Sequence, residues 1–355
     1  MEIDIHEAVK RNDLLYIDVR SPQEYAEASI PGAMNIPLFE DDQHHQLGII
    51  YHKLGEQEAR RLALEMVAPK LAGLTDQIVE ASGNKIPFLY CQRGGMRSLS
   101  LYQVLSMTGI TALRLKNGYK AYRKYINKRL VNYDLKSKLF VIHGLTGVGK
   151  TLVLKELEAQ GEPIIDLEGL ARHRGSVFGA VGDNSPRSQK DFDALLIEHL
   201  DRHKDSPYFV IEGEGRRIGN VYLPLFLARS MQEGEHILLT APLEIRVKRI
   251  VDTYIQLPLN DKVLEQLKKA IFSLEHRLSN QKVEQLAAML DKGEYYTVAE
   301  LLCTDYYDHF YKDSRSEHAD FCAKIDLTDI KNAAQQIIEM INNFYAFPSE
   351  TAQLD

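Results

Sequence analysis

Cysteine is scarce in this chain, which has only three, at Cys91, Cys303 and Cys322. The count is odd, and no two of them form a C-x-x-C pair. This pattern argues against a disulfide framework and against a zinc cluster built from cysteine pairs. We therefore expect the protein to work in a reducing compartment, the cytoplasm.

Long apolar runs and a recognisable targeting segment are also missing. No stretch of about 18 consecutive apolar residues occurs, so we expect no membrane span and no membrane partner. The first residues, MEIDIHEAVKRND, lack the basic and apolar regions of a secretory signal peptide. The formal net charge of −7 argues against a chain that is basic overall, although it is compatible with a local basic face.

The 355 residues are too many for one ordinary hydrophobic core, so we expect two or three domains. In the N-terminal part, short β-type runs alternate with segments of helical spacing, a pattern typical of a parallel α/β sheet. The β-type runs lie at residues 14–20, 86–90 and 112–119, and the helical spacing at residues 52–80 and 98–109.

A second α/β pattern begins after a boundary at about residues 128–137. Its apolar runs lie at residues 138–144, 162–168, 207–214 and 236–242. Beyond these runs the sequence consists mainly of amphipathic helical blocks. We therefore predict an α/β domain at residues 1–130, a parallel α/β domain at residues 137–255 and a mainly helical C-terminal region at residues 256–345.

Residues 91–98, CQRGGMRS, place a cysteine at the end of a predicted strand. The glycine-rich turn brings backbone N–H groups together, and these donors, with Arg93 and Arg97, would favour a thiolate at Cys91. Such a thiolate is a nucleophile that could hold transferred sulfur or selenium. The alternative is a buried structural cysteine, which is the usual role of a free cysteine. The flanking glycines and arginines favour the catalytic role here.

The segment GLTGVGKT fits the phosphate-binding pattern G-x-x-x-x-G-K-[ST], between a strand-like run and a helical segment, as that motif requires. Backbone N–H groups would surround a phosphate and Lys150 would balance its charge. The Thr151 hydroxyl would be placed to bind Mg²⁺. The residues predicted to form this phosphate cradle are Gly144, Thr146, Gly147, Gly149, Lys150 and Thr151.

Acids and arginines further along the chain could complete the phosphate cradle. Glu212 and Glu214 end a predicted strand, where an acid that holds a metal or orients water is expected. Two surface acids at a sheet edge are the alternative. Arg246 and Arg249 lie in a segment similar to the one that sends an arginine towards the phosphates in small P-loop kinases. A solvated helix face explains these two arginines equally well.

A compact polar cluster lies in DLEGLARHRGSVFG, at residues 166–179. It combines two acids with Arg172, His173 and Arg174 and a glycine–serine turn, directly after a predicted strand. We expect these three side chains to form a second wall for the phosphate ligand or to contact a substrate.

A basic stretch without a single acidic residue runs from Leu113 to Tyr133. Its cations are Arg114, Lys116, Lys120, Arg123, Lys124, Lys128 and Arg129, interleaved with Tyr119, Tyr122, Tyr125 and Tyr133. Cations bind phosphates and tyrosines stack on unpaired bases, so a looped RNA is one partner that fits this stretch. A solvated helix face with packed tyrosines is the other interpretation.

The first 130 residues resemble a rhodanese domain. IDVRSPQEY at 17–25, IPGAMNIP at 30–37, YCQRGGMRS around Cys91 and KNGYKAYRKY at 116–125 occur in the order typical of that family. The resemblance implies that Cys91 accepts the transferred atom. The arginine follows the cysteine by six residues, one more than in sulfurtransferase loops of this kind, as in the related phosphatase loops. This spacing suggests a phosphorus-containing donor.

Along most of its length the chain resembles the tRNA 2-selenouridine synthase family, through CQRGGMRS, KNGYKAYR, GLTGVGKT, DLEGLARHRGSVFG and EGEGRRIG. The resemblance implies a rhodanese-like domain joined to a P-loop NTPase-like domain. It also implies an enzyme that replaces the 2-thio sulfur of the wobble uridine of tRNA with selenium from selenophosphate, through S-geranylation by geranyl diphosphate. We expect these two small molecules and the tRNA anticodon arm as partners, and no tightly bound cofactor.

Under this resemblance the phosphate cradle would bind the diphosphate, Cys91 would carry or position selenium, and the basic stretch would hold the tRNA. Two alternatives stay open. One is an ATP-dependent RNA thiolation enzyme that uses a persulfide on Cys91. The other is a regulatory protein with a degenerate rhodanese fold, although Cys91, Lys150 and Thr151 are all present. The sequence does not determine the oligomeric state or the tRNAs that are recognised.

Overall fold

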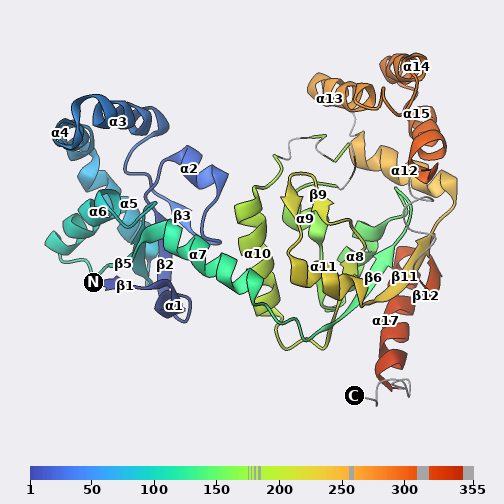
Figure 1. Cartoon of the computed structure of the whole chain (residues 1–355), viewed down its shortest axis with the longest axis horizontal. Coiled ribbons are helices and arrows are strands. Elements are labelled where there is room, and N and C mark those ends of the chain that lie inside the picture. The colour runs from blue at the N-terminus through green and yellow to red at the C-terminus, as the bar shows by residue number, and fades with distance from the viewer. Residues whose placement is uncertain are drawn as a thin grey trace. The chain divides into compact units, whose positions relative to one another are not determined.

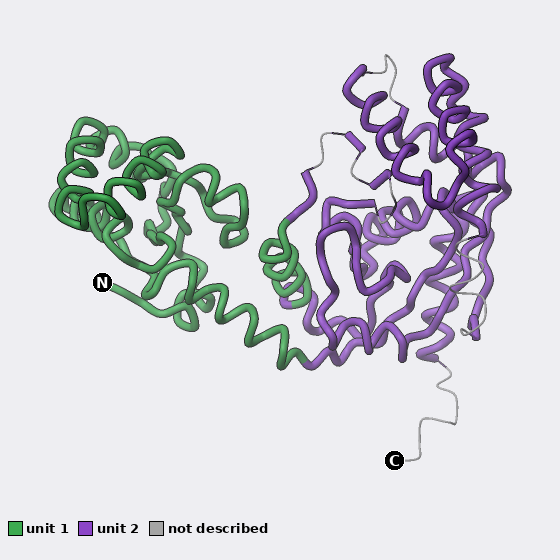
Figure 2. The backbone as a smooth tube through the Cα atoms, turned by 45° about the horizontal axis from the view of Figure 1, so that its top comes forward, with its two compact units in different colours: residues 1–133, 188–200 green, residues 134–187, 201–355 purple. Residues whose placement is uncertain are grey.

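The computed structural model describes residues 1–174, 176, 178–179, 181–182, 185–255, 260–309 and 320–346. The chain forms two compact units, which Figure 2 colours separately. Unit 1 consists of residues 1–133 and 188–200, and unit 2 contains the rest of the described chain. Each unit is built on a five-stranded sheet in which all strands are parallel, as the alternating pattern predicted.

The sheet of unit 1 has the strand order β1-β5-β4-β2-β3. Its strands are β1 (Glu2–Ile3), β2 (Leu14–Asp18), β3 (Met34–Asn35), β4 (Ile86–Tyr90) and β5 (Leu113–Leu115). Alternate residues of the central strand β4 pack into different hydrophobic clusters: Phe88 and Tyr90 into one, and Leu89 into the other, which also contains Cys91 directly after the strand. Both faces of this sheet are therefore buried, as is usual for parallel strands covered by helices.

The helices of unit 1 differ from the sequence expectation in two places. They are α1 (Ile5–Ala8), α2 (Pro22–Glu27), α3 (Asp41–Leu54), α4 (Glu56–Val67), the 3₁₀ turn η1 (Ala68–Lys70), α5 (Leu71–Ser82), α6 (Met96–Met107), α7 (Gly118–Val131) and α10 (Gln189–Arg202). The helical spacing at 52–80 is broken because Gly55 has a φ of 93° and Pro69 interrupts the pattern. Helix α10 belongs here because its Ala194 and Ile197 join the apolar cluster of α7.

The sheet of unit 2 has the strand order β12-β11-β6-β8-β7. Its strands are β6 (Lys138–His143), β7 (Ile164–Ile165), β8 (Tyr208–Glu212), β11 (Glu235–Thr240) and β12 (Phe321–Asp326), and β9 (Arg217–Ile218) and β10 (Val221–Tyr222) form a separate antiparallel pair. Strand β12 lies in the region that we expected to be mainly helical. It pairs with β11, with Ile237 opposite Ala323, and extends the sheet.

The helices of unit 2 form two groups. They are α8 (Lys150–Ala159), α9 (Leu167–Ala171), α11 (Leu225–Gln232), α12 (Leu243–Tyr254), α13 (Asp261–Phe272), α14 (Asn280–Asp291), α15 (Tyr295–Leu302), the π-helical turn η2 (Cys303–Tyr307) and α17 (Ile330–Ala346). Helix α17 packs against α8 beside the sheet, whereas α13, α14 and α15 gather next to α12 (Figure 1) and share their own apolar core. Within the described ranges no helix has the length and apolar character needed to cross a bilayer.

Candidate active sites

Cys91 lies directly after β4, the central strand of the unit 1 sheet, in the loop that leads into α6. Its side chain is buried, with Sγ 3.3 Å from the Ser98 hydroxyl and 3.9 Å from the Gly95 carbonyl oxygen. Ser98, in the first turn of α6, was not singled out from the sequence. The carboxyl end of a central parallel strand is a common ligand position, and the predicted nucleophile lies there.

The segment KNGY holds the Cys91 loop through its backbone. The Tyr119 N–H donates to the Cys91 carbonyl at 2.9 Å, and the Lys120 N–H donates to the Gln92 carbonyl at 3.0 Å. Gly118 has a φ of 56°, and a Cβ atom there would lie 2.0 Å from the Cys91 carbonyl oxygen. Only glycine fits this close approach of two backbone segments, which explains why the two motifs occur together.

Gly118→Ala should therefore destabilise unit 1 by about 3 kcal/mol or more, because the new methyl group overlaps backbone atoms of the Cys91 loop. Gly109→Ala is the matched control, because Gly109 also has a positive φ, 78°, but has open space around it. The control should lose only about 1 kcal/mol. Urea unfolding followed by circular dichroism measures both, and equal losses in the two variants would contradict the close-approach explanation.

The arginines near Cys91 have different environments. Arg93 is exposed, whereas Arg97 pairs with Glu24, with Nη2 3.2 Å from Oε1. Burial favours a raised pKa for Glu24, but the hydrogen bond and charge of Arg97 outweigh it and lower the pKa. The buried Arg20 also reaches the loop and donates to the Gln92 side chain at 3.3 Å. Arg20 was not predicted as a site residue, although it ends the IDVR motif.

The phosphate cradle lies between β6, the central strand of the unit 2 sheet, and α8. Two of its glycines have positive φ, 78° at Gly147 and 104° at Gly149, which bends the loop around the N-terminus of α8. The Lys150 Nζ atom lies 3.6 Å from Glu214 Oε1 and 3.5 Å from the Gly144 carbonyl oxygen. The loop thus places a lysine at a helix N-terminus, an arrangement suited to an anionic phosphate.

Two carboxylates flank the Thr151 hydroxyl. Its Oγ1 lies 3.3 Å from Glu212 Oε1 and 3.4 Å from Glu168 Oε2, and the Glu168 N–H donates to Glu212 Oε2 at 3.1 Å. Strands β6, β8 and β7 are neighbours, so their carboxyl ends bring these residues together. Glu212 was selected from the sequence for this role, whereas Glu168 was included only as one of the two acids of the polar cluster at residues 166–179. The signal for Glu168 is its position just after the short strand β7.

Burial, and then the charge of Glu168, raises the pKa of Glu212 well above its ordinary value. Burial, and then the charge of Glu214, raises the pKa of Glu168 to about 7. Burial beside other carboxyl groups therefore favours the protonated forms of both Glu168 and Glu212. A bound cation or a cationic ligand group would favour their charged forms.

The raised pKa of Glu168 predicts a pH dependence of stability. The unfolded chain releases this proton near pH 4.5, whereas the folded protein keeps it to about pH 7. The folded state binds more protons between these values, so the free energy of unfolding should fall as pH rises, by about 3 kcal/mol at most. Urea unfolding across this range should show a shallower fall for Glu168→Gln. The exposed Glu158→Gln should keep the wild-type slope, and equal slopes in all three proteins would contradict the assignment.

Arg246 and Arg249 donate hydrogen bonds to backbone carbonyl groups of the phosphate cradle. The Arg246 Nε donates to the Thr146 carbonyl at 2.9 Å, while its two terminal nitrogens bind Asp308. The Arg249 Nη1 donates to the Val148 carbonyl at 2.6 Å. Both arginines therefore stabilise the shape of the loop through its carbonyl groups, a role that neither sequence interpretation included.

Arg172, His173 and Arg174 line the same cavity of about 530 Å³ as the phosphate cradle. Burial lowers the pKa of His173, and the Arg174 guanidinium lies 5.1 Å from the centre of the Tyr254 ring. The cavity also includes Asp166 and Glu168. The polar cluster predicted as a second wall thus lines the same cavity as the P-loop.

The basic stretch divides into exposed and paired cations. The exposed ones are Lys116, Lys120, Lys124 and Lys128. Their spacing of four residues places those within α7 on one helix face. Arg114 pairs with Glu2, Arg123 pairs with Asp193 at 2.9 Å, and Arg129 lies over the rings of Tyr125 and Tyr133.

The tyrosines at the centre of this stretch are core residues. Tyr119 and Tyr122 are buried in the apolar cluster between α7 and the sheet. They are therefore not a platform for stacking bases, and the cationic surface of α7 consists of its lysines.

The described part of the chain contains no group of three or more His, Cys, Asp or Glu side chains arranged to hold a metal ion.

Comparison with known proteins identifies both domains. A model described as a rhodanese-like domain matches residues 4–125, and one described as the tRNA 2-selenouridine synthase AAA domain matches residues 137–342. A tRNA 2-selenouridine synthase from Cupriavidus necator is 33% identical over 328 residues, which cover 85% of this chain and 88% of the relative. A protein of the same name from Nitrosomonas europaea is 31% identical over 336 residues, covering 92% of this chain and 86% of the relative.

A third relative of that name, from Photobacterium profundum, is 32% identical over 336 residues, covering 87% of this chain and 91% of the relative. The second family model spans more than half of the chain, and the matches extend across both units. The predicted fold class is confirmed: a rhodanese-like α/β domain precedes a P-loop α/β domain. The chain belongs to the tRNA 2-selenouridine synthases, a family of tRNA-modifying enzymes.

Proposed function

We propose that this protein replaces the sulfur of wobble 2-thiouridine in tRNA with selenium from selenophosphate, through an S-geranylated base formed from geranyl diphosphate. The observation that supports this proposal is a pair of anion cradles, each placed directly after the central strand of its own parallel sheet. One contains the thiol of Cys91 and the other contains Lys150. The reaction needs two such sites, because both selenophosphate and geranyl diphosphate are phosphorus oxyanions.

The phosphate cradle suits the geranyl transfer. The sulfur of the thiouridine attacks C1 of geranyl diphosphate, the C1–oxygen bond breaks, and diphosphate leaves with the electron pair. Lys150 and the N-terminus of α8 would stabilise the charge that develops on the leaving group. The Thr151 hydroxyl and the Glu212 carboxylate are oxygen donors that fit Mg²⁺, which would neutralise further diphosphate charge when bound.

The cysteine loop suits the selenium transfer. Alkylation makes the sulfur a better leaving group, so selenium can add at C2 and geranylthiol can depart after taking up a proton. Hydrolysis of the phosphorus–selenium bond then releases phosphate. Two roles were left open for Cys91. Positioning selenophosphate requires no change of oxidation state, whereas forming a perselenide on Cys91 would require an oxidant. We therefore assign the positioning role to Cys91, with help from the nearby Arg93 and Arg97.

The exposed lysines of the basic stretch would contact the phosphates of the tRNA anticodon arm. Lys120, Lys124 and Lys128 present three charges on one face of α7. Contacts of this kind position the RNA without reading its sequence and weaken with added salt. The reducing cytoplasm, where tRNA is present, is the compartment that we propose for this reaction.

Mass analysis of tRNA nucleosides tests the proposal. The protein is incubated with tRNA that carries 2-thiouridine, together with selenophosphate and geranyl diphosphate but no ATP. We expect S-geranyl-2-thiouridine first and 2-selenouridine afterwards. A requirement for ATP, with uridine converted to 2-thiouridine from a persulfide donor, would instead support the thiolation alternative.

A further inference from the structure

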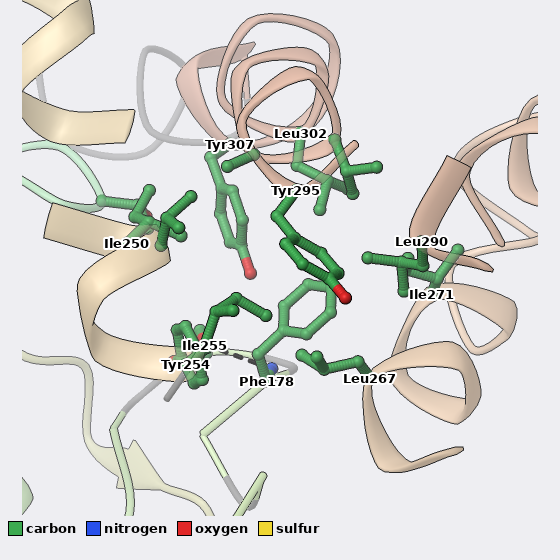
Figure 3. A pocket seen from close by; sticks show the side chains of 15 residues that line it. Phe178, Ile250, Tyr254, Ile255, Leu267, Ile271, Leu290, Tyr295, Leu302 and Tyr307 are labelled. Carbon is green, nitrogen blue, oxygen red and sulfur yellow. Dashed lines mark hydrogen bonds between the residues drawn. The ribbon is translucent and has the colours of Figure 1, made fainter. Parts of the chain in front are cut away.

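A second cavity lies beside the phosphate cradle in unit 2 and is almost entirely apolar (Figure 3). Its walls come from α12, α13, α14 and α15 and from Phe178. Figure 3 shows Ile250 of α12 on one side, Ile271 and Leu290 on the opposite side, and Tyr295 between them. A cavity of this composition binds hydrocarbon better than a polar group, because burying an unpaired polar atom is costly.

The two cavities are adjacent. Four residues line both of them: Thr146, Ser176, Ile250 and Tyr254. Tyr254 stands at the junction, where burial raises the pKa of its hydroxyl while hydrogen bonds with Ser176 and Arg174 oppose that rise. Its ring contacts both the Phe178 ring, with centroids 6.2 Å apart, and the Arg174 guanidinium, so Tyr254 borders an apolar and a polar environment. A molecule that fills both spaces must have an anionic head and an apolar tail.

We propose that the apolar cavity holds the hydrocarbon tail of the prenyl diphosphate whose head lies on the P-loop, and that its small volume limits the length of that tail. This inference rests on the proposed function, since it assigns a diphosphate head to the phosphate cradle. It adds a tail site, built partly from the C-terminal helices α13, α14 and α15, and a reason for chain-length selection.

The volume of the cavity supports this limit. It has about 60 Å³ of free space, and roughly 10–15 Å³ is the least that one water molecule needs, so only a short stretch of hydrocarbon fits. Ile250 and Tyr254 line both cavities, so the tail would pass these side chains between the head site and the apolar cavity. Ile271 and Leu290 line the side away from Ile250, and a longer tail would have to displace them.

The alternative is a packing gap in the apolar core of the helical group. Several wall residues, including Leu267, Ile271 and Leu290, belong to that core cluster. A packing gap would affect stability when its size is changed, but it would have no effect on which diphosphate binds. Ligand selectivity therefore separates the two explanations.

The first test fills the cavity. Ala299 of α15 lines it, so Ala299→Leu should raise the dissociation constant for geranyl diphosphate about tenfold or more, while inorganic diphosphate binds as before. Ala287→Leu is the control, because Ala287 is also a buried helical alanine but does not line the cavity. It should bind both ligands like the wild type. Unchanged geranyl diphosphate binding in Ala299→Leu would overturn the proposal.

The second test enlarges the cavity and gives a gain of binding. Leu290→Ala should increase affinity for farnesyl diphosphate relative to geranyl diphosphate by about tenfold, because it removes side-chain volume from the cavity wall. Leu286→Ala removes the same atoms from the same buried helix outside the cavity, and should leave that ratio unchanged. An unchanged ratio in Leu290→Ala would also overturn the proposal.

Different results would contradict the proposed function and the tail site. If wild-type protein binds neither inorganic diphosphate nor geranyl diphosphate, the proposed function itself is wrong. If inorganic diphosphate displaces geranyl diphosphate but Ala299→Leu and Leu290→Ala bind both prenyl diphosphates like their controls, the head site stands and only the tail site is wrong.

Discussion

Replacement of Cys91 with alanine is expected to stop selenium incorporation while S-geranyl-2-thiouridine still forms and accumulates. The thiol lies directly after β4, in the cysteine loop, where it would position selenophosphate. Loss of a group that positions one reactant costs about a hundredfold or more in rate. The geranyl step depends on unit 2, so it should proceed in this variant. Nucleoside mass analysis over time measures both products.

The control for this variant is Cys322→Ala. Cys322 is an exposed free cysteine at the edge strand β12, outside the cysteine loop. This variant should form 2-selenouridine at the wild-type rate, which would show that the effect is specific to the Cys91 thiol. If Cys91→Ala also produced 2-selenouridine at that rate, Cys91 would have no part in selenium transfer.

Lys150→Ala should instead impair the geranyl step. Geranylation should slow by about 10²–10³-fold, because one donor aimed at the charge that develops on the diphosphate is lost. The Lys150 Nζ atom lies beside Glu214 at the N-terminus of α8, where the diphosphate would bind. The measurement is the initial rate of S-geranyl-2-thiouridine formation with saturating tRNA. The variant should also bind inorganic diphosphate more weakly.

Lys138→Ala serves as the control for the loss of a lysine from unit 2. Lys138 begins β6, at the end of the strand away from the phosphate cradle, and pairs with Glu235 at 3.0 Å. Its replacement should leave the geranylation rate unchanged. A Lys150→Ala variant that geranylates as fast as this control would remove the P-loop from the proposed reaction.

Local motifs could be located from the sequence because adjacent residues determine them. GLTGVGKT lies between a strand and a helix in the chain itself, so the position of Lys150 and Thr151 followed from the motif. The same is true of Cys91 after β4. The close contact between Gly118 and the Cys91 loop joins two motifs that the rhodanese resemblance had already paired.

Contacts between distant segments could not be predicted in the same way. Glu168 meets Thr151 only because β7 is placed next to β8, and no local pattern specifies that strand order. Arg97 meets Glu24 across 73 positions of the chain. The partners of both residues are set by the fold.

The spacing of apolar residues did not predict strand β12 or the sheet that helix α10 covers. Strand β12 is a short segment with charged residues in it, and its strand state depends on pairing with β11 at the sheet edge. Helix α10 has an ordinary amphipathic pattern that does not indicate which sheet it covers. Its apolar side chains pack with α7, although neighbouring segments of the chain belong to unit 2.

The central claim is that the two cradles act in sequence on one base: the P-loop adds the geranyl group, and the cysteine loop then directs its replacement. The most direct test supplies tRNA that already carries S-geranyl-2-thiouridine, together with selenophosphate, to Lys150→Ala and Cys91→Ala. The account predicts that Lys150→Ala forms 2-selenouridine at the wild-type rate and that Cys91→Ala forms almost none. Equal defects in both variants, or full activity of Cys91→Ala, would contradict it.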